Sequence, residues 1–132
     1  MAFAGINYLA VIVAALAAFG FGAAWYGLLG KHWMAAVGMT EHPKPTPTPF
    51  IISLVALLVM AWTLAGLVGH IGEVTVWRGV VSGFFAWLGF VATTLVVNHR
   101  FQGSRWSLTF IDGGHWLGVL LVMGFVIGLF GV

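Results

Sequence analysis

Four side chains with the chemistry to bind a metal lie close to the ends of apolar stretches in this sequence. They are His32, His99, Asp112 and His115. Three imidazoles and one carboxylate form a ligand set that zinc accepts. Asp112 and His115 are three residues apart and can share one helical face, with Asp112 near the helix start, where the dipole favours an anion. Since no H-x-x-x-H pair occurs, we expect these groups to cap helices and hydrogen-bond, with metal binding as the rival interpretation.

Other chemistry is poorly represented. The sequence has no cysteine, so thiolate chemistry and Cys-based metal sites are excluded. His70 lies at the opposite side from the other candidate histidines, which argues against a bis-histidine heme. No Walker, Rossmann or protease motif is present, and a net charge of +2 gives no indication of nucleic-acid binding. We therefore predict a protein that is not an enzyme and carries no cofactor.

The elements that must position these residues are apolar helices. The sequence is 61% hydrophobic and only 6% charged, whereas soluble domains carry about 25% charged residues. Four apolar segments of about 19 to 23 residues are each long enough to cross a ~30 Å hydrocarbon core. The first ten residues contain no Lys or Arg, so we expect the first segment to remain as a span rather than a cleaved signal. The prediction is one all-α transmembrane domain, residues 1–132, with spans at about 6–28, 50–69, 76–97 and 113–131.

The few cations predict an orientation. Lys31 and Lys44 fall in the loop at 30–49, and Arg100 and Arg105 fall in the loop at 98–112, on the same side of a four-span bundle. Arg78 alone lies on the other side. The positive-inside rule places the four-cation side in the cytoplasm, so both termini should face outward, to the periplasm. The cytoplasmic loop also holds all four prolines, at 43, 45, 47 and 49, and we expect a stiff strut that leads into a helix capped by Thr48.

Amphipathic side chains agree with these boundaries, because such rings and long cations prefer the headgroup level. Gly27 and Gly30 should end the first helix, with a short interfacial helix following. Trp62 and Trp87 fall near mid-membrane, where helix packing, lipid contact or a stacked ligand would explain them. The predicted interfacial anchors are Trp25, Tyr26, Lys31, Trp33, Trp77, Trp106 and Trp116.

Glycines are the predicted means of helix packing. The sequence contains 19 of them, and small residues let membrane helices approach closely. Three G-x-x-x-G steps join Gly79 to Gly83, Gly114 to Gly118, and Gly124 to Gly128. We expect packing within the bundle, and the alternative is that the Gly124 and Gly128 face, continued by Gly131, meets a partner or a second copy.

Several motifs resemble the DUF1761 family of small bacterial membrane proteins, and the resemblance covers essentially the whole chain. They are Asn7, the Trp25–Tyr26–Gly27 run, the Leu29–Gly30–Lys31–His32–Trp33 run, and the Asp112–Gly113–Gly114–His115 run that precedes an apolar, glycine-spaced helix. His115 departs from the family pattern, where Tyr is more usual, and the proline strut is individual to this chain. The family is one of unknown function, so the resemblance implies a four-helix protein of the bacterial inner membrane and no activity.

Three functional hypotheses follow. The leading one is a non-enzymatic accessory or structural subunit of a membrane complex, or a homo-oligomer held by Gly-rich faces, with lipids, other subunits or itself as partners. The second is a small oligomeric transporter or channel. The third is a metal- or cofactor-binding membrane protein that uses the cytoplasmic-side histidines.

Overall fold

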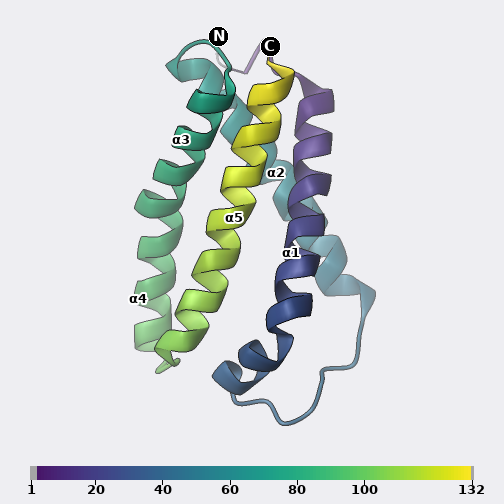
Figure 1. Ribbon diagram of the computed structural model, residues 1–132, viewed down its shortest axis with the longest axis vertical. Helices are drawn as coiled ribbons and strands as arrows, with labels where there is room; N and C mark the ends of the chain where they lie inside the picture. The colour runs from purple at the N-terminus through teal and green to yellow at the C-terminus, as the bar shows by residue number, and fades with distance from the viewer. Residues whose placement is uncertain (1–2, 132) are drawn as a thin grey trace.

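Four long antiparallel helices follow one another along the chain in the computed structural model, which describes residues 3–131 (Figure 1). They are α1 (Tyr8–Val37), α2 (Pro47–Ile71), the continuous run α3 (Val76–Ala86), η1 (Trp87–Ala92) and α4 (Thr93–Phe101), and α5 (Trp106–Phe130). All four are long and apolar enough to cross a membrane, which confirms the all-α prediction. Met1, Ala2 and Val132 of the predicted 1–132 domain lie outside the described residues. The α1–α2 and α4–α5 loops share one end, here called the loop end.

Helix α1 is longer than its sequence predicts. It continues through Gly27 and Gly30 to Val37, so the predicted break and separate interfacial helix are wrong. The helix ends where Gly38 adopts a left-handed φ of 88° and its N–H donates to Met34 O, while Met39 N–H donates to the same carbonyl. A glycine inside a helix costs roughly 0.5–1 kcal/mol relative to alanine but does not end the helix by itself, whereas Gly38 adopts the left-handed conformation that ends it. Thirty residues span about 45 Å, more than a hydrocarbon core.

Helix α2 begins two residues earlier than expected. Thr46, not Thr48, is the N-cap, and its side chain makes no capping hydrogen bond. Pro47 takes the first helical position, and Pro49 also lies in the first turn, where an N–H has no helical partner to lose. Only Pro43 and Pro45 therefore lie in the extended part of the loop.

The third span contains a π-helical segment, η1, in its middle. Such a segment loosens the regular backbone ladder and leaves carbonyl groups that need donors. Thr93 Oγ1 donates to Gly89 O at 2.8 Å, and Thr94 Oγ1 donates to Phe90 O at 2.7 Å. The two hydroxyls thus satisfy carbonyls on an exposed face of the helix, as an apolar environment requires.

Helix α5 starts at Trp106, and this changes the environment of Asp112. The predicted start at Gly113 is wrong, because the run from Trp106 to Ile111 contains no proline or glycine and remains helical. The α4–α5 connection is therefore a short turn at 102–105. Asp112 lies inside the helix rather than at its N-terminus, so the predicted dipole stabilisation at a helix start is also wrong.

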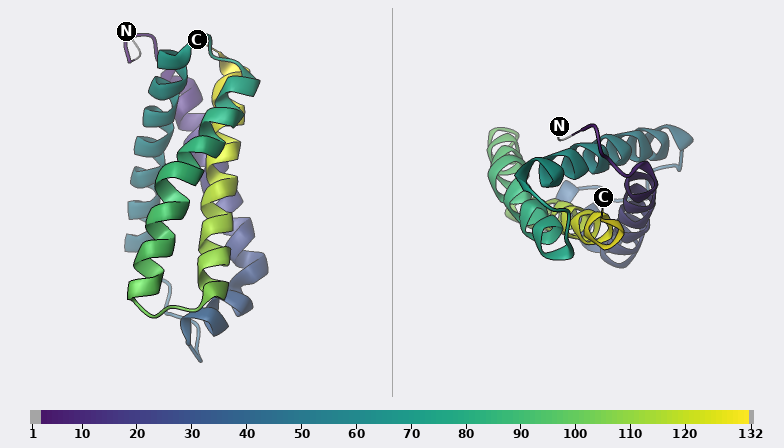
Figure 2. Two further views of the ribbon diagram at one scale, coloured as in Figure 1. Left: turned by 90° about the vertical axis from the view of Figure 1, so that its left-hand side faces the viewer. Right: turned by 90° about the horizontal axis from the view of Figure 1, so that it is seen from above.

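Helix α5 lies between α1 and α3 and packs against both through glycines (Figure 2). A Cβ atom at Gly79 or Gly124 would collide with the backbone of the other, and a Cβ at Gly83 would lie 2.5 Å from Leu120 O. Gly128 faces Thr75 and Val76 in the same way. On the other side, Gly114 and Gly118 receive the rings of Trp25 and Phe21. All six predicted packing glycines therefore make contacts within the chain.

We expect Gly124→Ala to lower the free energy of unfolding by about 1–3 kcal/mol, because the new methyl group must displace the Gly79 backbone. Unfolding in mixed micelles with increasing dodecyl sulfate, followed by circular dichroism, measures the change.

Gly89→Ala is the matched control, since a Cβ there meets no atom of residues 3–131 within 4 Å. Equal stability of the two variants would contradict the close α3–α5 contact.

Candidate functional site

Asp112 accepts a hydrogen bond from a residue of another helix. The hydroxyl of Tyr26, on α1, donates to Asp112 Oδ1 at 2.6 Å. A short hydrogen bond to a carboxylate is among the stronger polar contacts in proteins. It joins the Trp25–Tyr26–Gly27 run to the Asp112–Gly113–Gly114–His115 run, and it restricts the rotation of α1 against α5.

Two indole groups donate to the α5 backbone on either side of Asp112. Trp25 Nε1 donates to Ile111 O at 3.0 Å, and Trp87 Nε1, from η1, donates to Gly113 O at 2.9 Å. Buried indole N–H groups need an acceptor, and these carbonyls are approachable beside glycines. The three neighbouring residues 111–113 thus receive hydrogen bonds from two different helices.

His115 lies one turn further along α5, among aromatic rings. Its ring centroid is 4.8 Å from that of Tyr26, 4.6 Å from that of Trp116 and 6.3 Å from that of Phe21. The residue is 9% exposed. Nδ1 is buried and has no hydrogen-bond partner among the described residues. Beside the ring, a cavity of about 450 Å³ opens between α1, α2 and α5.

A second polar cluster lies at the loop end. His99 is buried, and its Nδ1 lies 2.8 Å from Thr109 Oγ1 on α5. Arg100 donates to Thr109 Oγ1 at 2.8 Å and to Ser104 O at 3.0 Å, and its guanidinium stacks 3.6 Å from the Trp106 ring centroid. These contacts clamp the α4–α5 turn. Arg105 joins the turn to α1 by donating to Ala35 O at 3.1 Å.

The proposed zinc ligands do not meet. His115 lies beside the Tyr26–Asp112 pair, and His99 contacts Thr109 at the loop end. Exposed His32 lines a separate, open cavity with Arg105 and Ser107. Residues 3–131 hold no group of three or more His, Cys, Asp or Glu that could bind a metal. The predicted convergence of these histidines with Asp112 is therefore wrong, because each packs against a different part of the bundle: His32 near Ser107, His99 against Thr109 and His115 beside Tyr26.

The residues predicted to anchor the protein at the membrane interface differ in exposure: some are exposed, and others make contacts within the bundle. Trp77 and Trp106 are 75% and 53% exposed, and Lys31 is exposed too. Trp25 and Tyr26 direct their polar atoms at α5, Trp116 packs on His115, and Trp33 meets the edge of Tyr26. Their roles as headgroup anchors stay predictions. Of the mid-membrane pair, Trp87 is a hydrogen-bond donor and Trp62 packs against Phe3.

Thr109 is the site residue that sequence reasoning missed, and for Trp87 it missed the role of hydrogen-bond donor. Thr109 lies in the stretch 98–112, which was predicted to be a loop. If residues 106–111 had been predicted as helix, Thr109 would have been recognised as a residue of α5 that can face His99. Trp87 carried a signal, since a mid-membrane indole needs an acceptor in a neighbouring helix.

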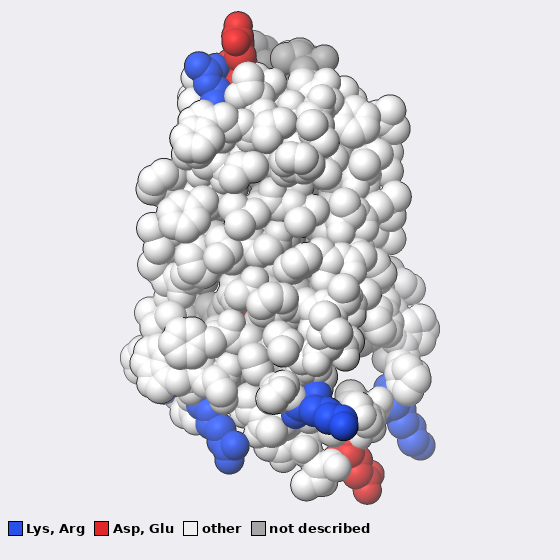
Figure 3. All heavy atoms as spheres, viewed as in Figure 1, with Lys and Arg blue, Asp and Glu red and all other residues white. Residues whose placement is uncertain are grey.

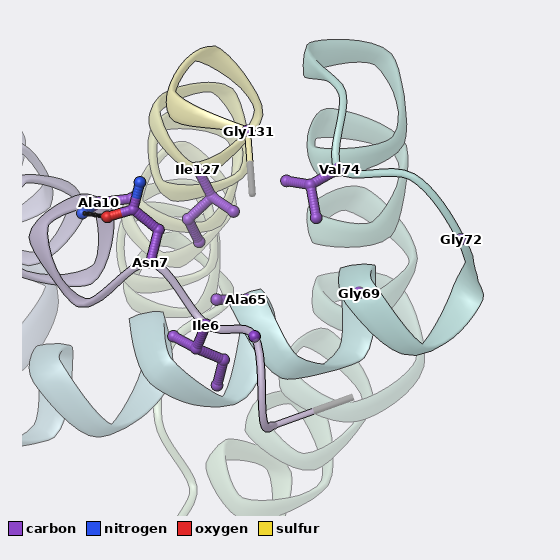
Figure 4. Close-up of a pocket in the computed structure, with 10 residues that line it drawn as sticks. Ile6, Asn7, Ala10, Ala65, Gly69, Gly72, Val74, Ile127 and Gly131 are labelled. Atoms are coloured by element: carbon purple, nitrogen blue, oxygen red, sulfur yellow. Dashed lines mark hydrogen bonds between the residues drawn. The ribbon is translucent and has the colours of Figure 1, made fainter. Parts of the chain in front are cut away.

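At the other end, a small cavity of about 150 Å³ is lined by Asn7, Ala65, Val74 and Ile127 among others (Figure 4). Asn7 Oδ1 accepts from Ala10 N–H at 3.1 Å, so its carbonyl caps α1. Apart from the Asn7 amide, the side chains that line this cavity are therefore apolar.

Four apolar helices, joined by hydrogen bonds that are satisfied between helices, define a multi-pass membrane protein. A family model described as "Protein of unknown function (DUF1761)" matches residues 9–128, and the chain belongs to this family. No curated protein and no solved structure matches the chain.

We expect Tyr26→Phe to lower the free energy of unfolding by about 1–3 kcal/mol, because the Asp112 carboxylate loses the donor that replaces water inside the bundle. Tyr8→Phe is the matched control, since Tyr8, the other tyrosine, is 61% exposed. The measurement is the same micellar unfolding titration. A loss no larger for Tyr26→Phe than for Tyr8→Phe would show that the hydrogen bond does not hold α1 on α5.

Proposed function

We propose that this protein is a non-enzymatic, multi-pass protein of the bacterial inner membrane that works as a homo-oligomer, with both termini in the periplasm. The carrying observation is a stripe of small residues on the outward face of α1. Gly20, Ala24 and Gly27 follow helical spacing and are all exposed. A Cβ at Gly20 or Gly27 would meet no described atom within 4 Å.

These glycines differ from those on α3 and α5. Gly79, Gly83, Gly124 and Gly128 make their contacts within the chain, so they are not available for the partner interface that their G-x-x-x-G steps favoured. A glycine costs about 1 kcal/mol of helix propensity relative to alanine, and inside the chain no contact offsets that cost at Gly20 or Gly27. Close approach of a second α1 would offset it, because small faces let membrane helices pack tightly.

The chemistry of the polar groups supports a structural role. Tyr26, Trp25, Trp87 and Arg100 each donate at least one hydrogen bond to another helix of the same bundle, so these donors serve to join helices. An accessory subunit would use the same α1 face against another protein, and that is the rival outcome of the test. The transporter hypothesis gains no supporting observation within residues 3–131.

The charge distribution supports the orientation. Lys31, Lys44, Arg100 and Arg105 belong to the loop end, whereas Arg78 and Glu73 lie together at the other end, where Arg78 donates to Glu73 O. Figure 3 shows Lys and Arg at the two ends, with an almost uncharged band between them. With the positive-inside rule, the loop end is the cytoplasmic side.

We expect Ala24→Cys to form a disulfide-linked dimer in native membranes, because α1 would meet its copy there. The chain has no cysteine of its own, so the introduced thiol alone reports. Non-reducing electrophoresis after mild oxidation reads the result. Phe90→Cys is the control, since Phe90 is 76% exposed on η1, away from α1.

A dimer from Phe90→Cys alone, or from neither variant, would contradict the α1 interface. A cross-link from Ala24→Cys to a different protein would contradict the homo-oligomer and identify an accessory subunit instead.

For the orientation, Glu73→Cys in intact cells should react with a membrane-impermeant maleimide, and Lys44→Cys should react only after the inner membrane is permeabilised. The exposed positions of both residues make the thiols accessible. The reverse pattern would place the loop end outside.

A further inference from the structure

An open groove of about 560 Å³ lies at the loop end, between the last turns of α1 and the first turns of α5 (Figure 1). Here it is called the loop-end groove. Its polar lining residues are His32, Arg105 and Ser107, and its apolar lining includes Leu29 and Phe110. No Asp or Glu is among the described residues that line it. The groove therefore combines a cation with an apolar surface.

The guanidinium of Arg105 is held in place by α1. Its Nη1 donates to Ala35 O at 3.1 Å, and the residue is nevertheless exposed. A guanidinium has five N–H donors, so others remain for a second acceptor. The side chains of His32 and Ser107, which are also exposed, add further donor groups. A fixed guanidinium with donors to spare suits the oxygens of a phosphate group.

The groove changes from polar to apolar along the axis of α5. Arg105 is the N-cap of this helix and Ser107 lies in its first turn, whereas Phe110 and Ile111 lie about 5 Å further along. Leu29 of α1 joins the apolar part, and Phe110 is 73% exposed. A phospholipid has the same order of groups, with its phosphate at one end and its acyl chains following.

The polar part also lies at the depth of a lipid headgroup. The 25 residues of α5 span about 37 Å, which exceeds the ~30 Å of a hydrocarbon core, so the first turn of the helix reaches the headgroup layer. Trp106, the first residue of α5, is exposed and has a side chain that prefers this layer. The phosphate of a lipid beside α5 would therefore be level with Arg105.

Charge selects among the phospholipids. This end of the bundle carries the cations Lys31, Lys44, Arg100 and Arg105 and one exposed carboxylate, that of Glu41. An anionic headgroup has a phosphate whose charge no ammonium group of the lipid offsets, so it gains more from these cations than a zwitterionic headgroup does. A free phosphate ion would contact the cation and leave the apolar part of the groove unused.

We propose that the loop-end groove binds an anionic phospholipid, whose phosphate accepts hydrogen bonds from Arg105 and Ser107 and whose acyl chain lies against Leu29, Phe110 and Ile111. The site goes beyond the homo-oligomer proposed above and does not depend on it. Gly27 of the small-residue stripe and Leu29 of the groove are two residues apart, which places them about 200° apart around α1.

The test is native mass spectrometry of the full chain, released from mild-detergent micelles that contain equimolar phosphatidylglycerol and phosphatidylcholine with the same acyl chains. The chain should retain phosphatidylglycerol over phosphatidylcholine by about fivefold, the ratio expected for one cation at a membrane surface. The ratio should fall as the ammonium acetate concentration rises, because salt screens the charges. The measurement resolves monomer from dimer, so it reports lipid retention in either oligomeric state.

Arg105→Gln removes the charge and keeps an amide that can donate to Ala35 O, so it should lower the ratio to near unity. Lys31→Gln is the matched control, since it removes the same charge from an exposed residue that does not line the groove, and it should preserve the ratio. Ser107→Glu places a carboxylate in the groove and should lower the ratio too. An acidic residue in the first turn favours a helix, so circular dichroism should show the fold intact.

A ratio near unity in the unsubstituted chain, an equal loss in Lys31→Gln and Arg105→Gln, or a ratio that does not change with salt would each overturn the proposal. Displacement of the bound lipid by inorganic phosphate would show that the site takes a soluble anion, and would overturn it too. If Arg105→Gln does not fold, the comparison of Ser107→Glu with Lys31→Gln still tests the groove.

Discussion

The close contact of backbones at glycine is the constraint on which this bundle depends. Helix α5 meets α3 where Gly124 faces Gly79, and at that point neither helix can carry a side chain. Since lipid gives little hydrophobic drive for helices to associate, short contact distance and hydrogen bonds must hold them together. Helix α3 packs on one side of α5, and the aromatic rings of α1 pack on the opposite side. The α3–α5 contact is therefore between backbones, whereas the α1–α5 contact is made by aromatic side chains.

Several of the hydrogen bonds between helices are made by aromatic side chains that pack against α5. Donors from α1 and η1 converge on residues 111–113 of α5, and each donor finds an acceptor on another helix. The arrangement satisfies polar groups where water is absent and fixes the helices rotationally. His115 differs from these donors, because its Nδ1 is buried and has no hydrogen-bond partner among the described residues, as is also true of Arg100 Nε at the loop end.

The sequence predicts the coarse architecture well and the polar contacts poorly. Composition and apolar length alone identify four helices, because each segment is long and apolar enough to cross a membrane. Three predicted helix boundaries, at Gly30, Thr48 and Gly113, were wrong for the same reason. Each was placed from a local signal for the start or end of a helix, but the observed helix continues past that residue. Membrane helices tolerate such signals, since breaking the backbone ladder in an apolar medium costs more than a poor propensity. The error at Gly113 then hid the environment of Asp112.

The pairing of distant residues could not be read from the chain at all. Asp112 and Tyr26 are 86 residues apart, and their contact depends on the rotation of two helices that no local pattern sets. The spacing of Gly79, Gly83, Gly124 and Gly128 did indicate close packing, but it could not distinguish a contact within the chain from one between chains. The unpaired Nδ1 of His115 likewise becomes visible only when all neighbours are in place.

The π-helical segment η1 changes the direction in which the second half of the third span, α4, presents its side chains relative to the first half, α3. A π-turn accommodates one residue more than an α-turn, so the residues beyond it are turned by roughly 100° relative to an uninterrupted α-helix. Before η1 the span presents Gly79 and Gly83 to α5, and after η1 it presents His99 to Thr109. The extra residue of the π-turn thus lets α3 and α4, in one continuous span, both contact α5. Deleting one residue from η1 would rotate α4 away from α5 and leave the α3–α5 contact in place.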